Sequence, residues 1–178
     1  MTMPATAAPP RGDDARWERW EKTGADKVAP LPGAREAFAQ LRGAGVTIIF
    51  NSNRSTANAA QTARALEGAG VGPAVPGDTL WLKGDVAPGS GKDARRLKAS
   101  EKYCIVALAG DQLGDFSDLF TGMLKEVPAR RAAADRPSIA GWWGAGWFVM
   151  PNPVYGTGTI GGWDAAFPAD KRWNGDER

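Results

Sequence analysis

Two carboxylates follow an apolar stretch of the chain at a spacing that can bind a metal ion. The run Cys104–Ala109 contains β-branched residues and ends at Gly110, and Asp111 and Asp115 come next. Such a run is typical of a buried strand in a parallel sheet, and ligands bind at the carboxyl ends of these strands. Two carboxylates one helical turn apart can hold a hard cation such as Mg²⁺. The alternative is that either aspartate only caps a helix.

A second group of polar residues follows the apolar stretch Val46–Phe50. Ser52, Asn53 and Arg54 come directly before an Ala-rich segment that is predicted to be helical. A hydroxyl and free N–H groups at a helix N-terminus can bind phosphate. The alternative is that Ser52 or Ser55 only caps the helix.

Lys92 is a third candidate, because it opens the next predicted helix after the sequence Gly89-Ser90-Gly91. A cation at a helix N-terminus opposes the helix dipole, so this position favours an anion nearby. The alternative is a lysine that is simply solvated.

The composition excludes several kinds of active site. The 178 residues include no histidine, which excludes Ser-His-Asp triads and His-ligated metals. The single cysteine, Cys104, lies in a predicted strand and is expected to be packed and inert. A net charge of +2 is too small to indicate nucleic acid or a membrane surface as a partner. No apolar run is long enough to span a membrane.

Strands and helices alternate along the chain, and they must position the three polar groups. Helices are predicted near 15–23, 33–43, 55–68, 91–101 and 122–134, and strands at 46–50, 79–82, 103–109 and 147–150. This alternation predicts an α/β fold in which helices flank a parallel sheet. Most of the eight tryptophans are expected to serve in packing.

The order of the polar motifs resembles motifs two, three and four of the haloacid dehalogenase-like (HAD) superfamily. Six segments in order resemble the acid phosphatases of the class B and lipoprotein acid phosphatase (5′-nucleotidase-like) type: Trp17–Trp20, Leu31–Ala34, Ser52–Arg54, Ser90–Arg96, Gly110–Phe116 and Met150–Gly156. The resemblance spans roughly residues 17–163. It implies a HAD-like Rossmannoid sheet and hydrolysis of phosphate monoesters, with nucleotides as one candidate class, through an aspartyl-phosphate.

The resemblance implies roles for the residues around the phosphate. Ser52 would hydrogen-bond the phosphoryl oxygens. Lys92 would offset negative charge at the nucleophile and the phosphate. Asn53 and Arg54 would line the phosphate or leaving-group side of the site.

The resemblance also implies a Mg²⁺ site. Asp111 would ligate the metal, and Asp115 would be a second ligand or would orient it through water. Relatives usually have Asn where this chain has Gln112, a departure that concerns only the surroundings of the metal. Because the carboxyl ends of parallel strands share one edge, we expect the Lys92 ammonium and the Asp111 carboxylate to lie within about 10 Å.

The main departure from the family is motif one, a strand that ends in Asp-x-Asp and supplies the nucleophile and the general acid/base. The 178 residues contain no Asp-x-Asp, and Asp13-Asp14 follows no apolar strand. In the superfamily this strand lies between the strands of motifs two and four. We therefore expect a truncated, inactive form with a gap in its sheet. The alternatives are that the 46–50 and 104–109 strands pair directly, or that the chain is a non-catalytic remnant that binds phosphate or a partner.

The expected organisation is a tail at 1–14, a phosphatase domain at 15–163 and a second tail at 164–178. The N-terminus lacks the basic start and the apolar segment of a signal peptide. Relatives are typically exported, which implies the periplasm or cell envelope for the full parent protein, and the cytoplasm for the polypeptide expressed as written. A small phosphate monoester is the expected partner.

Overall fold

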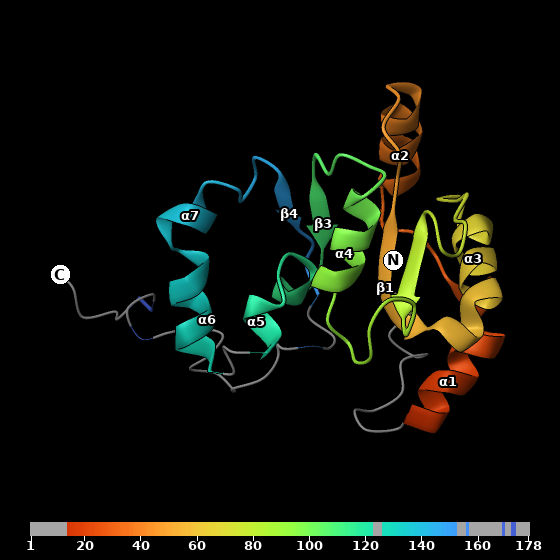
Figure 1. The fold of residues 1–178 in the computed structure, drawn as a ribbon, viewed down its shortest axis with the longest axis horizontal. Helices are drawn as coiled ribbons and strands as arrows, with labels where there is room; N and C mark the ends of the chain where they lie inside the picture. Colours follow the sequence, from red (N-terminus) through yellow and green to blue (C-terminus); the bar gives the residue numbers. More distant parts are fainter. Residues whose placement is uncertain (1–13, 123–125, 153–155, 157–168, 170–171, 174–178) are drawn as a thin grey trace. The chain divides into compact units, whose positions relative to one another are not determined.

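The computed structural model describes residues 14–122, 126–152, 156, 169 and 172–173, and the chain divides into two compact units. The first unit ends at Cys104 and the second begins at Ile105. Figure 1 shows the elements of both units, which alternate between helix and strand as predicted. The two expected tails fall outside the described residues, apart from Asp14, which begins the first helix, and residues 169 and 172–173. No described helix is long and apolar enough to cross a membrane.

The first unit contains a two-stranded parallel sheet. Strand β1, Phe50–Ser55, pairs with β2, Leu80–Lys83, and the register shifts between Ser52 and Ser55. Helices are α1, Asp14–Thr23; α2, Ala34–Gly43; α3, Ala59–Gly68; and α4, Asp93–Ser100. Short 3₁₀ turns lie at Ala25–Lys27 and Thr56–Asn58. Helix α3 connects β1 to β2, which is the usual crossover between parallel strands.

The core of the first unit lies between α3 and the sheet. Buried side chains from the end of α3, from the following segment and from β2 form one cluster: Leu66, Ala69, Val71, Ala74, Leu80 and Leu82. Leu80 and Leu82 alternate with more exposed neighbours, so one face of β2 packs on this core. The cluster holds β1 through its pairing with β2, and β1 carries the Ser52 motif.

Asp78 connects the turn before β2 to the residues that follow α4 through hydrogen bonds. Its Oδ1 accepts hydrogen bonds from Lys102 Nζ and Tyr103 Oη, both at 2.8 Å. These two donors hold the pKa of Asp78 below its usual value, with Lys102 as the larger cause. This contact ties the end of the helix that begins beside Lys92 to the sheet.

Helix α1 is attached to the end of β1 by a buried carboxylate. Glu21 is only 1% exposed. Its Oε2 accepts from Ser55 N at 3.1 Å and from Asn58 Nδ2 at 3.0 Å, and its Oε1 accepts from Trp17 Nε1 at 2.7 Å. A buried carboxylate is stable only when such donors replace water. Glu21 therefore fixes the backbone that follows the Ser52 motif.

We expect Glu21→Ala to lower the free energy of unfolding by roughly 3 kcal/mol, because it leaves three donors without an acceptor. Denaturant unfolding followed by tryptophan fluorescence measures this change. Glu18→Ala is the matched control, since Glu18 lies on the same helix in an exposed ion pair with Lys22 and should matter little. Equal effects of the two substitutions would contradict the role given to Glu21.

The second unit is built around another parallel pair and an aromatic cluster. Strand β3, Leu108–Gly110, pairs with β4, Trp147–Val149. Helices are α5, Leu119–Gly122; α6, Val127–Ala134; and α7, Pro137–Ala140, and a 3₁₀ turn spans Leu113–Asp115. Trp143 and Trp147 lie 5.1 Å apart between ring centroids, and the Phe116 ring contacts both. These two tryptophans pack as expected, whereas Trp142 and Trp173 are exposed.

The two predicted buried strands need correction. Regular strand begins only at Phe50 in the first case and at Leu108 in the second, so Val46–Ile49 and Cys104–Ala107 are not in a described strand. Ile105 is 41% and Val106 66% exposed. An apolar run indicates a segment suited to burial, but burial requires a partner strand, and the described residues provide none for these segments. Cys104 is likewise exposed, not packed as predicted.

Candidate functional site

The Ser52 motif lies in the last part of β1, before the 3₁₀ turn that precedes α3. Ser52 Oγ accepts a hydrogen bond from Arg54 N at 3.2 Å, and Ser55 Oγ accepts from Ala57 N at 3.2 Å as the N-cap of that turn. Of the two serines proposed as caps, Ser55 has that function. The hydroxyl hydrogen of Ser52 can still be donated to a ligand, because the contact with Arg54 uses only a lone pair.

Lys92 contacts the backbone that carries this motif. Its ammonium donates to Asn51 O at 2.8 Å, and Asn51 Nδ2 donates back to Lys92 O at 3.3 Å. Lys92 is the N-cap of α4, so the unfavourable helix dipole is offset by a carbonyl acceptor. Lys92 is therefore not solely solvated, and an anion beside it stays a prediction. Ser52, Asn53 and Lys92 thus lie together in the first unit.

Arg95 is a member of this group that was not among the predicted site residues. It is 3% exposed, and its guanidinium donates to Ser52 O and to Asn53 Oδ1. It also donates to Gly91 O at 2.8 Å. The available signal was its place one turn after Lys92, which puts both cations on the same side of α4.

Arg54 points in a different direction from Asn53. It is 7% exposed, and its guanidinium lies over the ring of Trp20, 4.7 Å from the centroid. Alternate side chains of a strand point to opposite faces, which separates Arg54 from its exposed neighbour Asn53. The structure therefore places Arg54 against α1, and a substrate contact for it stays a prediction.

In the second unit, Asp115 binds the backbone in front of it. Its Oδ2 accepts from Asp111 N and from Gln112 N, both at 2.9 Å. Gln112 is the N-cap of the 3₁₀ turn, and its side chain accepts from Asp115 N in return. This reciprocal capping box corresponds to the alternative in which Asp115 caps a helix. Gln112 makes it with a longer side chain than the Asn of relatives.

Asp111 is held from the neighbouring strand. Its Oδ2 accepts a hydrogen bond from Asn152 Nδ2. Met150 N donates to Gly110 O at 2.7 Å, so the two chain segments leave the carboxyl ends of β3 and β4 side by side. Asn152 lies in the Met150–Gly156 segment of the family resemblance, and its contact with Asp111 makes it a further candidate site residue.

We expect Gly110→Ala to destabilise the second unit by about 1–3 kcal/mol, because a Cβ atom there would overlap the side chain of Asp115. The measurement is urea unfolding. Gly43→Ala is the control: Gly43 ends α2 with nothing within 4 Å of its missing Cβ, so alanine should stabilise that helix slightly. Equal free energies of unfolding for Gly110→Ala and Gly43→Ala would contradict the close contact between position 110 and the Asp115 side chain.

The carboxylates of the second unit suit an oxygen-binding cation. Asp111 Oδ1 has no hydrogen bond within the described residues, while Asp115 Oδ2 is engaged with backbone amides. The described residues contain no cluster of three or more His, Cys, Asp or Glu that would hold a metal by itself. Mg²⁺ commonly binds one or two carboxylates and completes its shell with water and phosphate oxygens, and Asp111 fits that kind of partial site.

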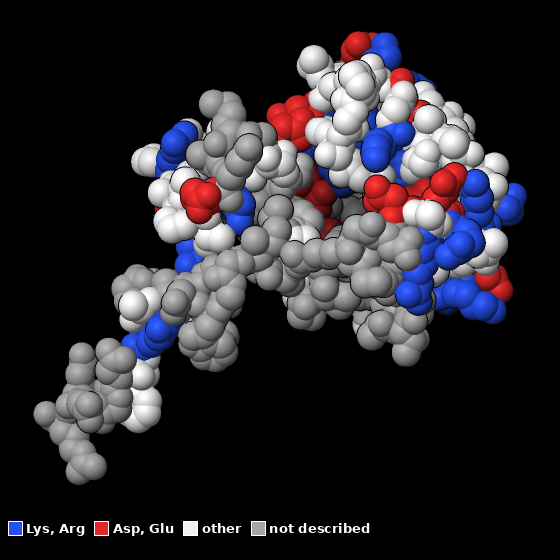
Figure 2. Space-filling model, turned by 90° about the horizontal axis from the view of Figure 1, so that it is seen from below, with Lys and Arg blue, Asp and Glu red and all other residues white. Residues whose placement is uncertain are grey.

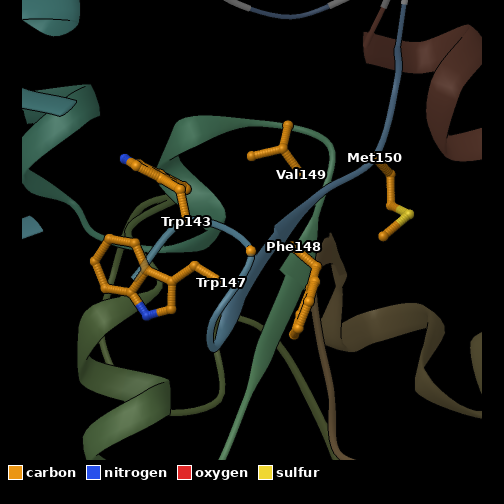
Figure 3. Close-up of a pocket in the computed structure, with 6 residues that line it drawn as sticks. Trp143, Trp147, Phe148, Val149 and Met150 are labelled. Atoms are coloured by element: carbon orange, nitrogen blue, oxygen red, sulfur yellow. The ribbon is translucent and has the colours of Figure 1, made fainter. Parts of the chain in front are cut away.

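The other surface features are less suited to phosphate chemistry. A hollow of about 380 Å³ lies along β4, and Figure 3 shows the aromatic and aliphatic side chains around it: Trp143, Trp147, Phe148, Val149 and Met150, with Gly144 completing the lining. None of these residues titrates. On the face shown in Figure 2, acidic and basic side chains lie among one another and form no single basic surface.

The chain belongs to the HAD superfamily, subfamily IIIB (acid phosphatase), because the model of that family matches residues 11–158. This confirms the resemblance based on the six motifs. The α/β class with short parallel sheets and flanking helices is confirmed as well. A comparison with curated proteins finds no significant match.

Two solved structures are similar to this chain. One is the class C acid phosphatase from Bacillus anthracis, with 29% identity and a TM-score of 0.66. The other is the class C acid phosphatase from Bacillus anthracis with tungstate bound, with 28% identity and a TM-score of 0.67. Each alignment covers 82% of this chain and 57% of the other, so this chain spans little more than half the length of those phosphatases.

Proposed function

We propose that this chain is part of a Mg²⁺-dependent acid phosphatase domain whose parent reaction is hydrolysis of small phosphate monoesters. The observation that carries the proposal is the pair of cations on α4. Lys92 and Arg95 donate to the successive carbonyl groups of Asn51 and Ser52, which holds the Ser52 motif beside positive charge. A phosphate ester is the ligand that such a hydroxyl and ammonium suit.

In this proposal each residue has a limited task. Ser52 donates its hydroxyl proton to a phosphoryl oxygen, and Lys92 offsets the charge of the phosphate. Asp111 would hold the cation, Asn152 hydrogen-bonds Oδ2 of Asp111, and Asp115 keeps the Asp111 backbone in place. When bound, Mg²⁺ would neutralise charge on the phosphoryl group. The distance of about 10 Å expected between the Lys92 ammonium and the Asp111 carboxylate stays a prediction.

A second function is favoured by the lack of any Asp-x-Asp in the 178 residues. Covalent phosphoryl transfer needs a nucleophile, and a chain without one would bind an oxyanion or a partner but not turn over. We propose this non-catalytic function for the 178-residue polypeptide, and the acid phosphatase reaction for the parent protein.

We expect the chain to bind tungstate, the oxyanion named for one of the similar structures, and Lys92→Ala to weaken that binding about tenfold. A tenfold loss is about 1.4 kcal/mol, which is near the value of one hydrogen bond to a charged group. Isothermal titration calorimetry measures the affinity.

Lys98→Ala is the matched control for this binding experiment. Lys98 lies on the same helix in an exposed ion pair with Glu101, so its loss should leave the affinity unchanged. If the chain binds no tungstate, or if both variants weaken binding equally, the oxyanion site is not where we propose it.

A further inference from the structure

Arg95 is a buried cation with a specific set of acceptors. With 3% of its surface exposed, it reaches the carbonyls of Ser52, Gly91 and Ser90, the last at 3.3 Å, and the side chain of Asn53. Burying a guanidinium is costly unless its N–H groups are satisfied in this way. Arg95 therefore joins the end of β1 to the loop before α4.

The contact with Asn53 determines which way its carboxamide faces. A guanidinium has donors and no acceptor, so the Asn53 atom in contact with it must be the oxygen. The NH₂ group of Asn53 must then face the other way. Asn53 is exposed, and within the described residues its NH₂ group has no partner. The side chain is thus oriented as a donor toward solvent.

We propose that Arg95 is a positioning residue that orients Asn53 as a hydrogen-bond donor to the oxyanion. This inference rests on the proposed phosphate site and adds a residue and a mechanism to it. Arg95 is too buried to contact the ligand itself, so it acts through Asn53. An amide held in advance binds an anion better than a freely rotating one, because the cost of ordering it is met during folding.

The orientation can be tested without any ligand. In ¹⁵N relaxation experiments, the side-chain NH₂ group of Asn53 should be ordered in the wild-type chain and mobile in Arg95→Lys. A lysine keeps the charge but cannot reach several acceptors at once with a planar fork. Arg96→Lys is the matched control, since Arg96 is the next residue and its guanidinium pairs with Asp93. Its Asn53 signal should stay ordered.

The coupling is tested by tungstate affinity in a double-mutant cycle. We expect Arg95→Lys to weaken binding about fivefold in the wild-type background and to have almost no effect in an Asn53→Ala background. Asn53→Asp keeps an acceptor for Arg95 but removes the donor, so it should fold normally and bind at least about tenfold more weakly. A residue with a purely structural role would weaken binding equally in both backgrounds.

The outcomes separate this inference from the proposed function. If the wild-type chain binds no tungstate while Asn53 is ordered by Arg95, the oxyanion site fails and the positioning contact stands. If the Asn53 NH₂ group is equally mobile in the wild type and in Arg95→Lys, the positioning role is overturned whether or not tungstate binds. Equal losses of affinity in the two backgrounds would also overturn it.

Discussion

The 178-residue chain is expected to release no phosphate from an aryl phosphate above the uncatalysed background, even with Mg²⁺ in the acidic to neutral range. The family resemblance implies a reaction through an aspartyl-phosphate, and the sequence contains no Asp-x-Asp to form it. The roles proposed for Ser52 and Lys92, binding and charge neutralisation of a phosphoryl group, do not replace a nucleophile. Loss of a covalent nucleophile removes most of the rate enhancement of such enzymes.

Asp111→Asn is the control for this assay. If the background is uncatalysed, the wild type and Asp111→Asn should release phosphate at the same slow rate. Robust turnover that Asp111→Asn abolishes would mean that another residue of this chain acts as the nucleophile. In that case the non-catalytic function would be wrong for the 178-residue polypeptide.

Helix α2 could be predicted accurately, whereas the strands expected at 46–50 and 103–109 begin later than predicted, for a physical reason. Helix α2 was expected at 33–43 and spans Ala34–Gly43, because its periodic apolar face and the glycines at its end are local signals. Apolar runs such as Val46–Phe50 report only that a segment suits burial. Whether the segment is paired depends on a neighbour that is distant in sequence.

Candidate site residues that lie in local sequence motifs could be named from the sequence, whereas contacts between distant segments could not. Ser52, Lys92 and Asp111 belong to motifs, so their positions could be read from the sequence. The acceptors of Arg95 come from two separate segments, around Ser52 and around Gly91, and only the folded chain brings them together. The role of Glu21 could not be predicted either, because nothing in the pattern of α1 indicates that this carboxylate would be buried.

Adding a strand is expected to stabilise the chain. Val46–Ile49 and Cys104–Ala107 lie outside the described strands, and the described residues offer no hydrogen-bond acceptor to the amides of Thr47–Ile49 or of Cys104–Ala107. An extended, apolar and unpaired segment can accept another strand by backbone pairing. The family resemblance implies that a strand ending in Asp-x-Asp pairs with both segments.

We therefore expect a peptide with an apolar strand that ends in Asp-x-Asp to raise the melting temperature and to restore some phosphatase turnover. At a peptide concentration of about 100 Kd the stabilisation would be about 2.7 kcal/mol. For a chain of this size that corresponds to a shift of about 5–11 °C. Differential scanning calorimetry measures the shift, and phosphate release measures the activity.

A peptide ending in Asn-x-Asn is the matched control, because it keeps the strand and removes the nucleophile. It should raise the melting temperature as much as the first peptide and restore no turnover, which separates strand pairing from chemistry. A proline in the middle of the strand should abolish both effects, since it removes a backbone donor and disrupts pairing. If the chain alone is monomeric and melts cooperatively at high temperature, and no peptide changes this, its exposed segments need no partner. The non-catalytic function would then be favoured over the phosphatase function.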